Sequence, residues 1–162
     1  MLRRANGIAA LLLLAVFSAH AIMGALFCWG MLSDELSWIV WVGVGVIAVH
    51  VALSVVTTCQ MLCDEARPPS AKKKAHQIKK WVTGVLIGVV AVAHVLTVFE
   101  TLLWSVIALA LDVALVTHVC VCAKSLVKDL KLAPRWRYVI RVFVIAISIF
   151  VGLTIVEPSI LI

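Results

Sequence analysis

Long apolar stretches alternate with short polar connections along the whole chain. A membrane-spanning helix needs roughly 20 apolar residues to cross about 30 Å of hydrocarbon. Five stretches reach this length, at about 6–30, 37–61, 81–99, 102–124 and 138–156. The pattern predicts an all-α membrane protein, a single transmembrane domain over residues 1–162 that forms a bundle of five helices.

The composition agrees with this pattern. The chain is 64% hydrophobic and 14% charged, which leaves too few polar residues to cover a soluble domain of 162 residues. The net charge of +6 is also typical of nucleic-acid binders. The basic residues are confined to particular connections, however, so we expect contact with membrane lipid and no nucleic-acid partner.

The distribution of basic residues predicts the orientation. Two precede the first stretch, six lie between the second and third, and five lie between the fourth and fifth. The other two connections contain none, so the positive-inside rule places the N-terminus in the cytoplasm and the C-terminus outside. Tryptophans near the expected helix ends fit this topology: Trp29, Trp38, Trp41, Trp81, Trp104 and Trp136.

The N-terminus also resembles a signal peptide. Arg3 and Arg4 precede an apolar core, and Ala19-His20-Ala21 is similar to a cleavage site. The apolar run continues to Phe27, well beyond a normal signal core. We therefore expect an uncleaved first helix. Cleavage after Ala21 would remove His20 and break the set of four histidines.

Four histidines lie one each in the first four apolar stretches: His20, His50, His94 and His118. The fifth, His76, is predicted to lie in a polar loop. An ionisable side chain inside the bilayer is costly and usually functional, and imidazole is a common metal ligand. Each histidine alone is as compatible with a satisfied polar contact as with ligation. The four together favour ligation.

The predicted topology assigns each histidine a depth. At about 1.5 Å per residue from the cytoplasmic boundary, His20 and His94 lie roughly 21 and 20 Å deep, and His50 and His118 roughly 16 and 9 Å deep. This predicts an outer pair, His20 with His94, and an inner pair, His50 with His118. Each pair could clamp one b-type haem iron from both faces. Such closed coordination suits electron transfer rather than oxygen chemistry.

Small residues accompany these histidines. Gly24, Gly43, Gly84 and Gly88 lie within a few turns of them and could let a flat macrocycle approach the backbone. Each glycine alone is better explained by ordinary helix packing.

Carboxylates and cysteines offer further candidate chemistry. Asp112 is the only carboxylate well inside the expected hydrocarbon, either for quinone or proton chemistry or as a neutral hydrogen-bonding group. Asp34, Glu35 and Glu100 are candidate proton carriers near a quinone by location alone. The five cysteines do not form a disulfide framework. Buried apolar thiols are a better interpretation than a metal site.

Several motifs are missing from the chain. It has no dinucleotide fingerprint, no P-loop and no Cys-x-x-Cys-His for covalent haem attachment. It also has no soluble domain for a water-soluble substrate. Electrons would therefore be exchanged with a separate subunit and with a lipid-soluble carrier.

The histidine order and one local motif resemble a known family. His76-Gln77-Ile78-Lys79-Lys80-Trp81-Val82-Thr83-Gly84, followed ten residues later by His94, is similar to the cytochrome b membrane anchor of succinate dehydrogenases and fumarate reductases, of the five-helix, two-haem, single-chain type. The resemblance implies the same two haem pairs. It also implies a flavoprotein and an iron–sulfur subunit on the cytoplasmic face, menaquinone or menaquinol as the substrate, and a bacterial-type inner membrane.

The resemblance is incomplete, and two other functions compete with it. The chain is short for the family, and Val116 stands where some relatives carry a glutamate, which puts a proton route at that position in doubt. One competing function is a di-haem anchor for another respiratory reductase. The other is a haem-free membrane scaffold or transporter subunit. On each of these interpretations the chain is not an enzyme on its own.

Overall fold

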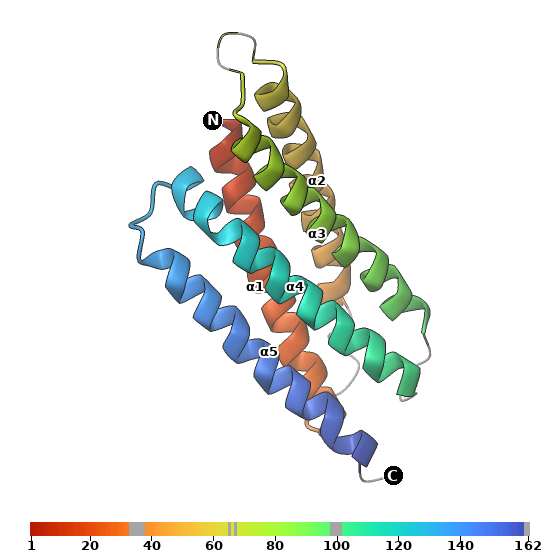
Figure 1. Cartoon of the computed structure of the whole chain (residues 1–162). Helices are drawn as coiled ribbons and strands as arrows, with labels where there is room; N and C mark the ends of the chain where they lie inside the picture. Colours follow the sequence, from red (N-terminus) through yellow and green to blue (C-terminus); the bar gives the residue numbers. More distant parts are fainter. Residues whose placement is uncertain (33–37, 65, 67, 98–101, 161–162) are drawn as a thin grey trace.

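The computed structural model of the chain is all-helical over the residues it describes, which are 1–32, 38–64, 66, 68–97 and 102–160 (Figure 1). Side chains are described as far as Ile155. All five helices are long and apolar enough to cross a membrane, which confirms the predicted all-α bundle of a multi-pass membrane protein. In chain order they are α1 (Leu2–Cys28), α2 (Trp38–Leu62), α3 (Ala71–Leu96), α4 (Leu102–Asp129) and α5 (Trp136–Ile160).

The start of α3 differs from the prediction. The helix begins at Ala71 rather than near Trp81, so His76 lies in its second turn and the prediction of a loop there is wrong. The Ser70 side chain caps the helix by accepting a hydrogen bond from the backbone N–H of Lys73 at 3.4 Å. The following alanine, lysine and glutamine residues are strong helix formers, so the charged segment extends α3 rather than linking it to α2.

The end of α4 also lies beyond the predicted boundary, at Asp129. Lys131 then adopts a left-handed backbone conformation with φ 58°. The backbone N–H groups of Lys131 and Leu132 donate to the carbonyls of Lys128 and Val127, at 3.1 and 2.9 Å. These two bonds form a Schellman motif, which satisfies carbonyls that the last turn would otherwise leave unpaired.

The helices pack as two antiparallel hairpins with α5 laid against them. One hairpin is α1 with α2 and the other is α3 with α4, and α5 packs along α4 and part of α1 (Figure 1). The hairpins approach each other closely only along α1 and α4. Between α2 and α3 there is almost no close backbone contact. Near one end, however, Thr58 Oγ1 on α2 accepts hydrogen bonds from Gln77 Nε2 at 2.8 Å and Trp81 Nε1 at 3.2 Å on α3.

The buried core lies where α4, α5 and α1 meet. Ala108 of α4 and Val151 and Ile155 of α5 form its centre, and Ala21 of α1 packs against them. Elsewhere the chain turns large apolar side chains outward: Val89 is 63% exposed and Val142 66% exposed. This distribution is the reverse of a soluble fold and matches a bundle that is surrounded by lipid.

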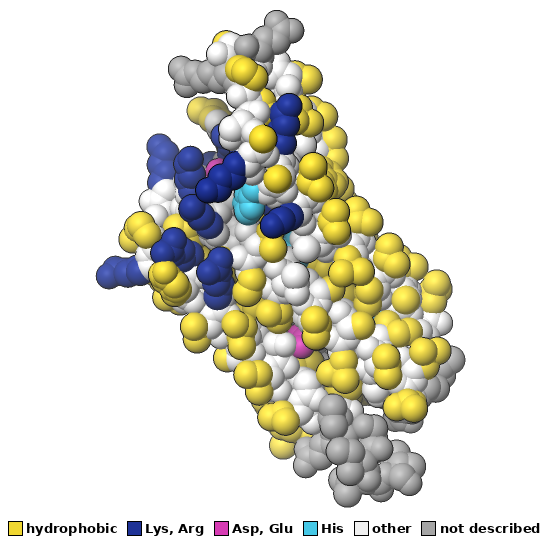
Figure 2. Space-filling model, in the orientation of Figure 1, with side chains coloured by type: hydrophobic (Ala, Val, Ile, Leu, Met, Phe, Trp, Pro, Cys, Tyr) yellow, Lys and Arg dark blue, Asp and Glu magenta, His cyan; other side chains and the backbone are white. Residues whose placement is uncertain are grey.

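Basic side chains gather at one end of the bundle (Figure 2). The alternating direction of the helices brings the start of α1, the start of α3, the end of α4 and the start of α5 to this end, while the C-terminus lies at the other (Figure 1). We call it the basic end. The residues that form it include Arg3, Arg4, Lys72, Lys73, Lys74, Lys79, Lys80, Lys124, Lys128, Lys131, Arg135, Arg137 and Arg141. The positive-inside rule predicts that this end faces the cytoplasm.

Candidate functional site

The four intramembrane histidines lie on four different helices, His20 on α1, His50 on α2, His94 on α3 and His118 on α4. The structure brings them together in two pairs. His94 lies within electrostatic reach of His20, and His118 lies within electrostatic reach of His50. Each pair joins one helical hairpin to the other. The pairs therefore link α1 with α3 and α2 with α4.

His118 has the most complete surroundings of the four. Its Nδ1 lies 2.8 Å from the Thr83 hydroxyl oxygen on α3, and its Nε2 lies 3.5 Å from the Cys122 sulfur one turn along α4. Gly84 leaves space for this ring, because a Cβ there would lie 3.4 Å from His118 Cε1. On α3, the Thr83 hydroxyl thus contacts the His118 ring, and Gly84 leaves room for it.

A hydrogen count assigns the His118 tautomer. The Thr83 hydroxyl has one hydrogen, and its oxygen lies 2.9 and 3.1 Å from the carbonyls of Lys79 and Lys80 in the preceding turn. A threonine inside a helix commonly donates to such a carbonyl. Thr83 can then only accept from His118, which puts the ring proton on Nδ1 and leaves the lone pair on Nε2. Neutral imidazole binds a metal through such an unprotonated ring nitrogen.

The other three histidines make fewer contacts with polar side chains, although His50 also interacts with the backbone of Asn6. The Nδ1 atoms of His50 and His94 are buried and have no hydrogen-bond partner. The His94 ring also packs beside Trp104, with centroids 5.3 Å apart and planes 38° apart. The His20 side chain is exposed at the chain's own surface although it lies near His94. His50, His94 and His118 thus each offer a ring nitrogen that no protein oxygen occupies.

These observations fit a group that is ligated by paired imidazoles. If b-type haem binds here, the paired histidines would hold it through ring nitrogens, and Thr83 would help to orient His118. Beside Gly24 and Gly88 a Cβ would find no atom within 4 Å, whereas at Gly43 it would meet Val16 of α1 at 3.4 Å. Gly43 is therefore explained by helix packing, and Gly24 and Gly88 border open space.

Asp112, the predicted carboxylate that the structure describes, is bonded to a serine and not to a histidine. Asp112 of α4 accepts a short hydrogen bond from Ser148 Oγ of α5, so it tethers these two helices on another face of α4. Asp34, Glu35 and Glu100 lie outside the described residues. A quinone or proton role for any of the four stays a prediction.

None of the five cysteines forms a disulfide, and Cys59 and Cys63 are exposed. In the part of the chain that the structure describes, no group of three or more histidine, cysteine or acidic side chains could hold a metal ion. Paired imidazoles do not require such a group, because the macrocycle supplies the remaining ligands.

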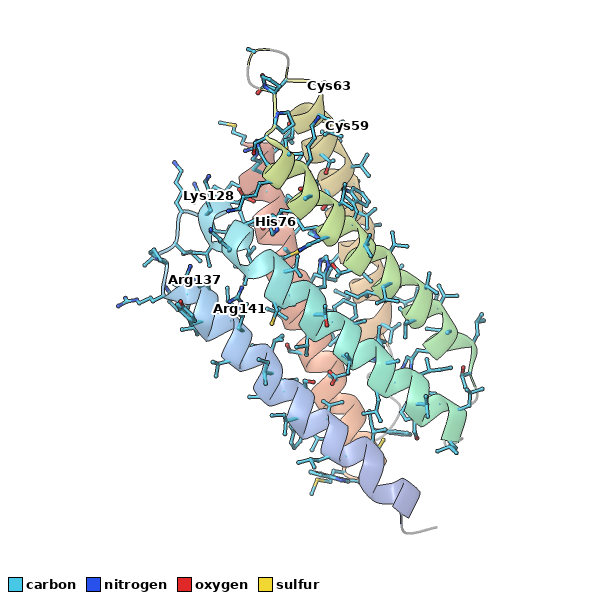
Figure 3. The ribbon with its side chains drawn as sticks, viewed as in Figure 1. Cys59, Cys63, His76, Lys128, Arg137 and Arg141 are labelled. Atoms are coloured by element: carbon cyan, nitrogen blue, oxygen red, sulfur yellow. The ribbon has the colours of Figure 1, made fainter. Side chains whose placement is uncertain are left out.

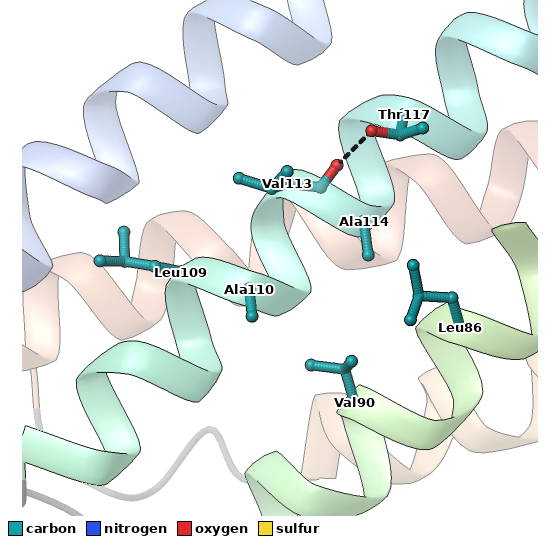
Figure 4. A pocket seen from close by; sticks show the side chains of 7 residues that line it. All are labelled: Leu86, Val90, Leu109, Ala110, Val113, Ala114 and Thr117. Carbon is teal, nitrogen blue, oxygen red and sulfur yellow. Dashed lines mark hydrogen bonds between the residues drawn. The ribbon is translucent and has the colours of Figure 1, made fainter.

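An apolar groove of about 380 Å³ lies between α3 and α4 (Figure 4). The Thr117 hydroxyl on its wall donates to the Val113 carbonyl of its own helix at 2.8 Å, so its hydrogen is not available to a ligand. The groove is lined by apolar side chains that lipid could contact, and its lining residues include no group suited to catalysis. Its lining residues are Leu86, Val90, Leu109, Ala110, Val113, Ala114 and Thr117.

Sequence reasoning missed the cross-helix contacts of His118. Thr83 is part of the local motif that precedes His94, but nothing in the sequence indicated that its hydroxyl reaches a histidine on α4. The Cys122 contact was readable as spacing, since residues four apart share a helix face.

No family model matches the chain, and neither a curated protein nor a solved structure shows significant similarity to it.

Proposed function

We propose that the chain is a di-haem b-type membrane anchor of the succinate:quinone oxidoreductase and fumarate reductase kind. The observation that carries the proposal is the pairing of four imidazoles across two helical hairpins, His20 with His94 and His50 with His118. When bound, two b-type haems would supply one-electron transfer between two depths of the membrane. The four histidines would hold them, and Thr83 would orient His118.

The proposed function requires two kinds of partner, one at the basic end and one within the membrane. The basic end offers a cationic surface to a cytoplasmic flavoprotein and iron–sulfur pair. A lipid-soluble quinone, menaquinone in the family that the sequence resembles, would exchange electrons within the membrane. The localisation that follows is a bacterial-type cytoplasmic membrane.

Haem counting in single and double variants tests the pairing. We expect two b-type haems per purified wild-type chain, measured by the pyridine haemochrome and a reduced-minus-oxidised spectrum. His20→Ala and His94→Ala should each lose one haem, and the double variant should lose no more than either single variant. Combining His20→Ala with His50→Ala should remove both haems.

His76→Ala is the matched control, because His76 lies on α3 in the charged extension and outside both pairs. It should keep two haems. A well-folded wild-type chain that stays colourless after expression in haem-replete cells would refute the proposal and leave a haem-free scaffold or transporter subunit. Copurification of a soluble reductase without succinate or fumarate activity would instead identify an anchor for another respiratory enzyme.

A further inference from the structure

Two arginines at the start of α5 have unpaired hydrogen-bond donors. Arg137 and Arg141 are four residues apart, so their side chains leave the same face of the helix. The Nε atom of each is shielded from solvent and has no hydrogen-bond partner. Buried donors in proteins are almost always paired, so two such atoms in neighbouring side chains indicate a missing acceptor.

Neutral groups hold both guanidinium groups in place. Arg141 Nη2 donates to the Cys120 carbonyl of α4 at 2.9 Å. Arg137 Nη2 donates to the Tyr138 hydroxyl at 2.6 Å, and its Cζ lies 4.5 Å from the centre of that ring. These contacts position the side chains at the junction of α4 and α5 without neutralising their charge (Figure 3).

No described carboxylate neutralises the two arginines. Asp129, at the end of α4, is the described acidic residue closest to them in sequence, and its electrostatic partners are Lys80, Arg3 and Lys128. The remaining neighbours in sequence add positive charge: Lys124, Lys128, Lys131 and Arg135. The junction therefore carries an uncompensated positive charge.

The position of the arginines indicates the kind of anion. Arg137 is one residue and Arg141 five residues from the start of α5 at Trp136, roughly 1.5 and 7.5 Å along the helix axis. Both arginines therefore lie in the first two turns of α5, at the end of the bundle where the positive-inside rule predicts the membrane interface and its lipid phosphates. The histidine pairs are separate from this junction, because His118 faces α3 whereas Arg141 binds α4 from the α5 side.

We propose that Arg137 and Arg141 form a binding site for the phosphate of an anionic phospholipid at the α4–α5 junction. A guanidinium presents paired N–H groups that match phosphate oxygens, and turning each Nε–H onto the phosphate would satisfy both unpaired donors. A lipid with a net negative charge is favoured over a zwitterionic one, because the surrounding lysines repel a choline group.

Equilibrium lipid binding tests this site on the full chain. The purified protein is titrated with phosphatidylglycerol or phosphatidylcholine in mixed micelles, and bound lipid is counted by native mass spectrometry. We expect Arg137→Gln with Arg141→Gln to weaken phosphatidylglycerol binding about tenfold or more. Lys72→Gln with Lys73→Gln removes the same charge from exposed positions of α3 and should change it less than about twofold.

Each alternative outcome overturns the proposal in a distinct way. Equal weakening in the two double variants would show that only overall charge matters. Equal affinity for the two lipids, or full competition by inorganic phosphate, would show that the site does not select an anionic lipid. If the double arginine variant does not fold, Arg141→Lys keeps the charge but loses the planar fork, and unchanged phosphatidylglycerol affinity in that variant would contradict the assignment.

Discussion

Replacing Thr83 by valine removes the hydroxyl that holds His118 and keeps the shape of the side chain. In the wild-type chain, the Thr83 oxygen lies 2.8 Å from His118 Nδ1. Valine offers no acceptor, so the Nδ1–H is left unpaired in a half-buried position. The carbonyls of Lys79 and Lys80 lose only the extra bond from the hydroxyl. The substitution therefore acts mainly on His118.

The expected magnitude follows from this one contact. A buried donor without a partner costs about 1–3 kcal/mol, and each 1.4 kcal/mol changes an equilibrium constant about tenfold. Replacing the groups that orient metal ligands lowers metal affinity by roughly 10- to 100-fold. We therefore expect the affinity of the inner haem site, which uses His50 and His118, to fall about 10- to 100-fold. The outer site, which uses His20 and His94, should be unchanged.

Haem titration into the haem-free chain in detergent measures both sites through Soret absorbance. Thr83→Ser restores the hydroxyl and should restore the inner affinity. Thr117→Val is the matched control, because Thr117 is adjacent to His118 in sequence but bonds only the carbonyl of Val113. A second readout needs no haem: nitrogen-15 NMR should show His118 protonated on Nδ1 in the wild-type chain, with a mixed tautomer in Thr83→Val.

Two results would refute the reasoning. Wild-type affinity at both sites in Thr83→Val, with an unchanged His118 tautomer, would show that the hydroxyl does not orient the ring. An equal loss in Thr117→Val would show that the effect comes from general weakening of the helices. If the wild-type chain binds no haem but Thr83→Val still shifts the tautomer, the contact is correct and the proposed function is wrong.

Three further predictions concern other contacts of the fold. Lys131→Gly should stabilise the chain by about 1 kcal/mol in reversible denaturation, because glycine adopts the left-handed conformation without strain, whereas Lys131→Ala should give no gain. Asp112→Leu should destabilise it by about 0.6–1.7 kcal/mol through loss of the bond to its serine partner on α5, and unchanged unfolding would mean that this contact carries no weight. Gly84→Ala should perturb the inner haem spectrum more than Gly88→Ala does, because its Cβ would contact His118 Cε1 at 3.4 Å, whereas a Cβ at Gly88 would find no atom within 4 Å.

The five helices were predictable because membrane spans are specified by length and apolarity alone. The start of α3 was not, since the lysines between Lys72 and Lys80 carry the same charge in a loop and in a helix. The choice depended on Ser70, whose side chain caps the helix. A helix cap depends on a single residue. The sequence analysis gave more weight to the run of lysines and therefore predicted a loop.

Depth alone predicted which histidines come together but not what surrounds them. Measured from the expected boundary at Trp81, Thr83 would lie roughly 3 Å deep and His118 about 9 Å deep, yet their side chains are hydrogen-bonded. Helix tilt and boundary error of several Å explain the difference. Contacts between side chains on neighbouring helices depend on rotation about each helix axis, which a single sequence with apolar residues on every face of its helices does not reveal.

The early start of α3 has a mechanical consequence. The helix is continuous from the exposed lysines to Thr83, and the hydroxyl of Thr83 is bonded to the carbonyls of Lys79 and Lys80 in the last turn of the charged extension. A protein that binds the charged extension could therefore move the part of α3 that contacts His118. Bending α3 at this turn would rotate the Thr83 hydroxyl away from the His118 imidazole. Binding of a partner at the membrane surface and the orientation of a histidine inside the membrane would then be coupled through one continuous helix.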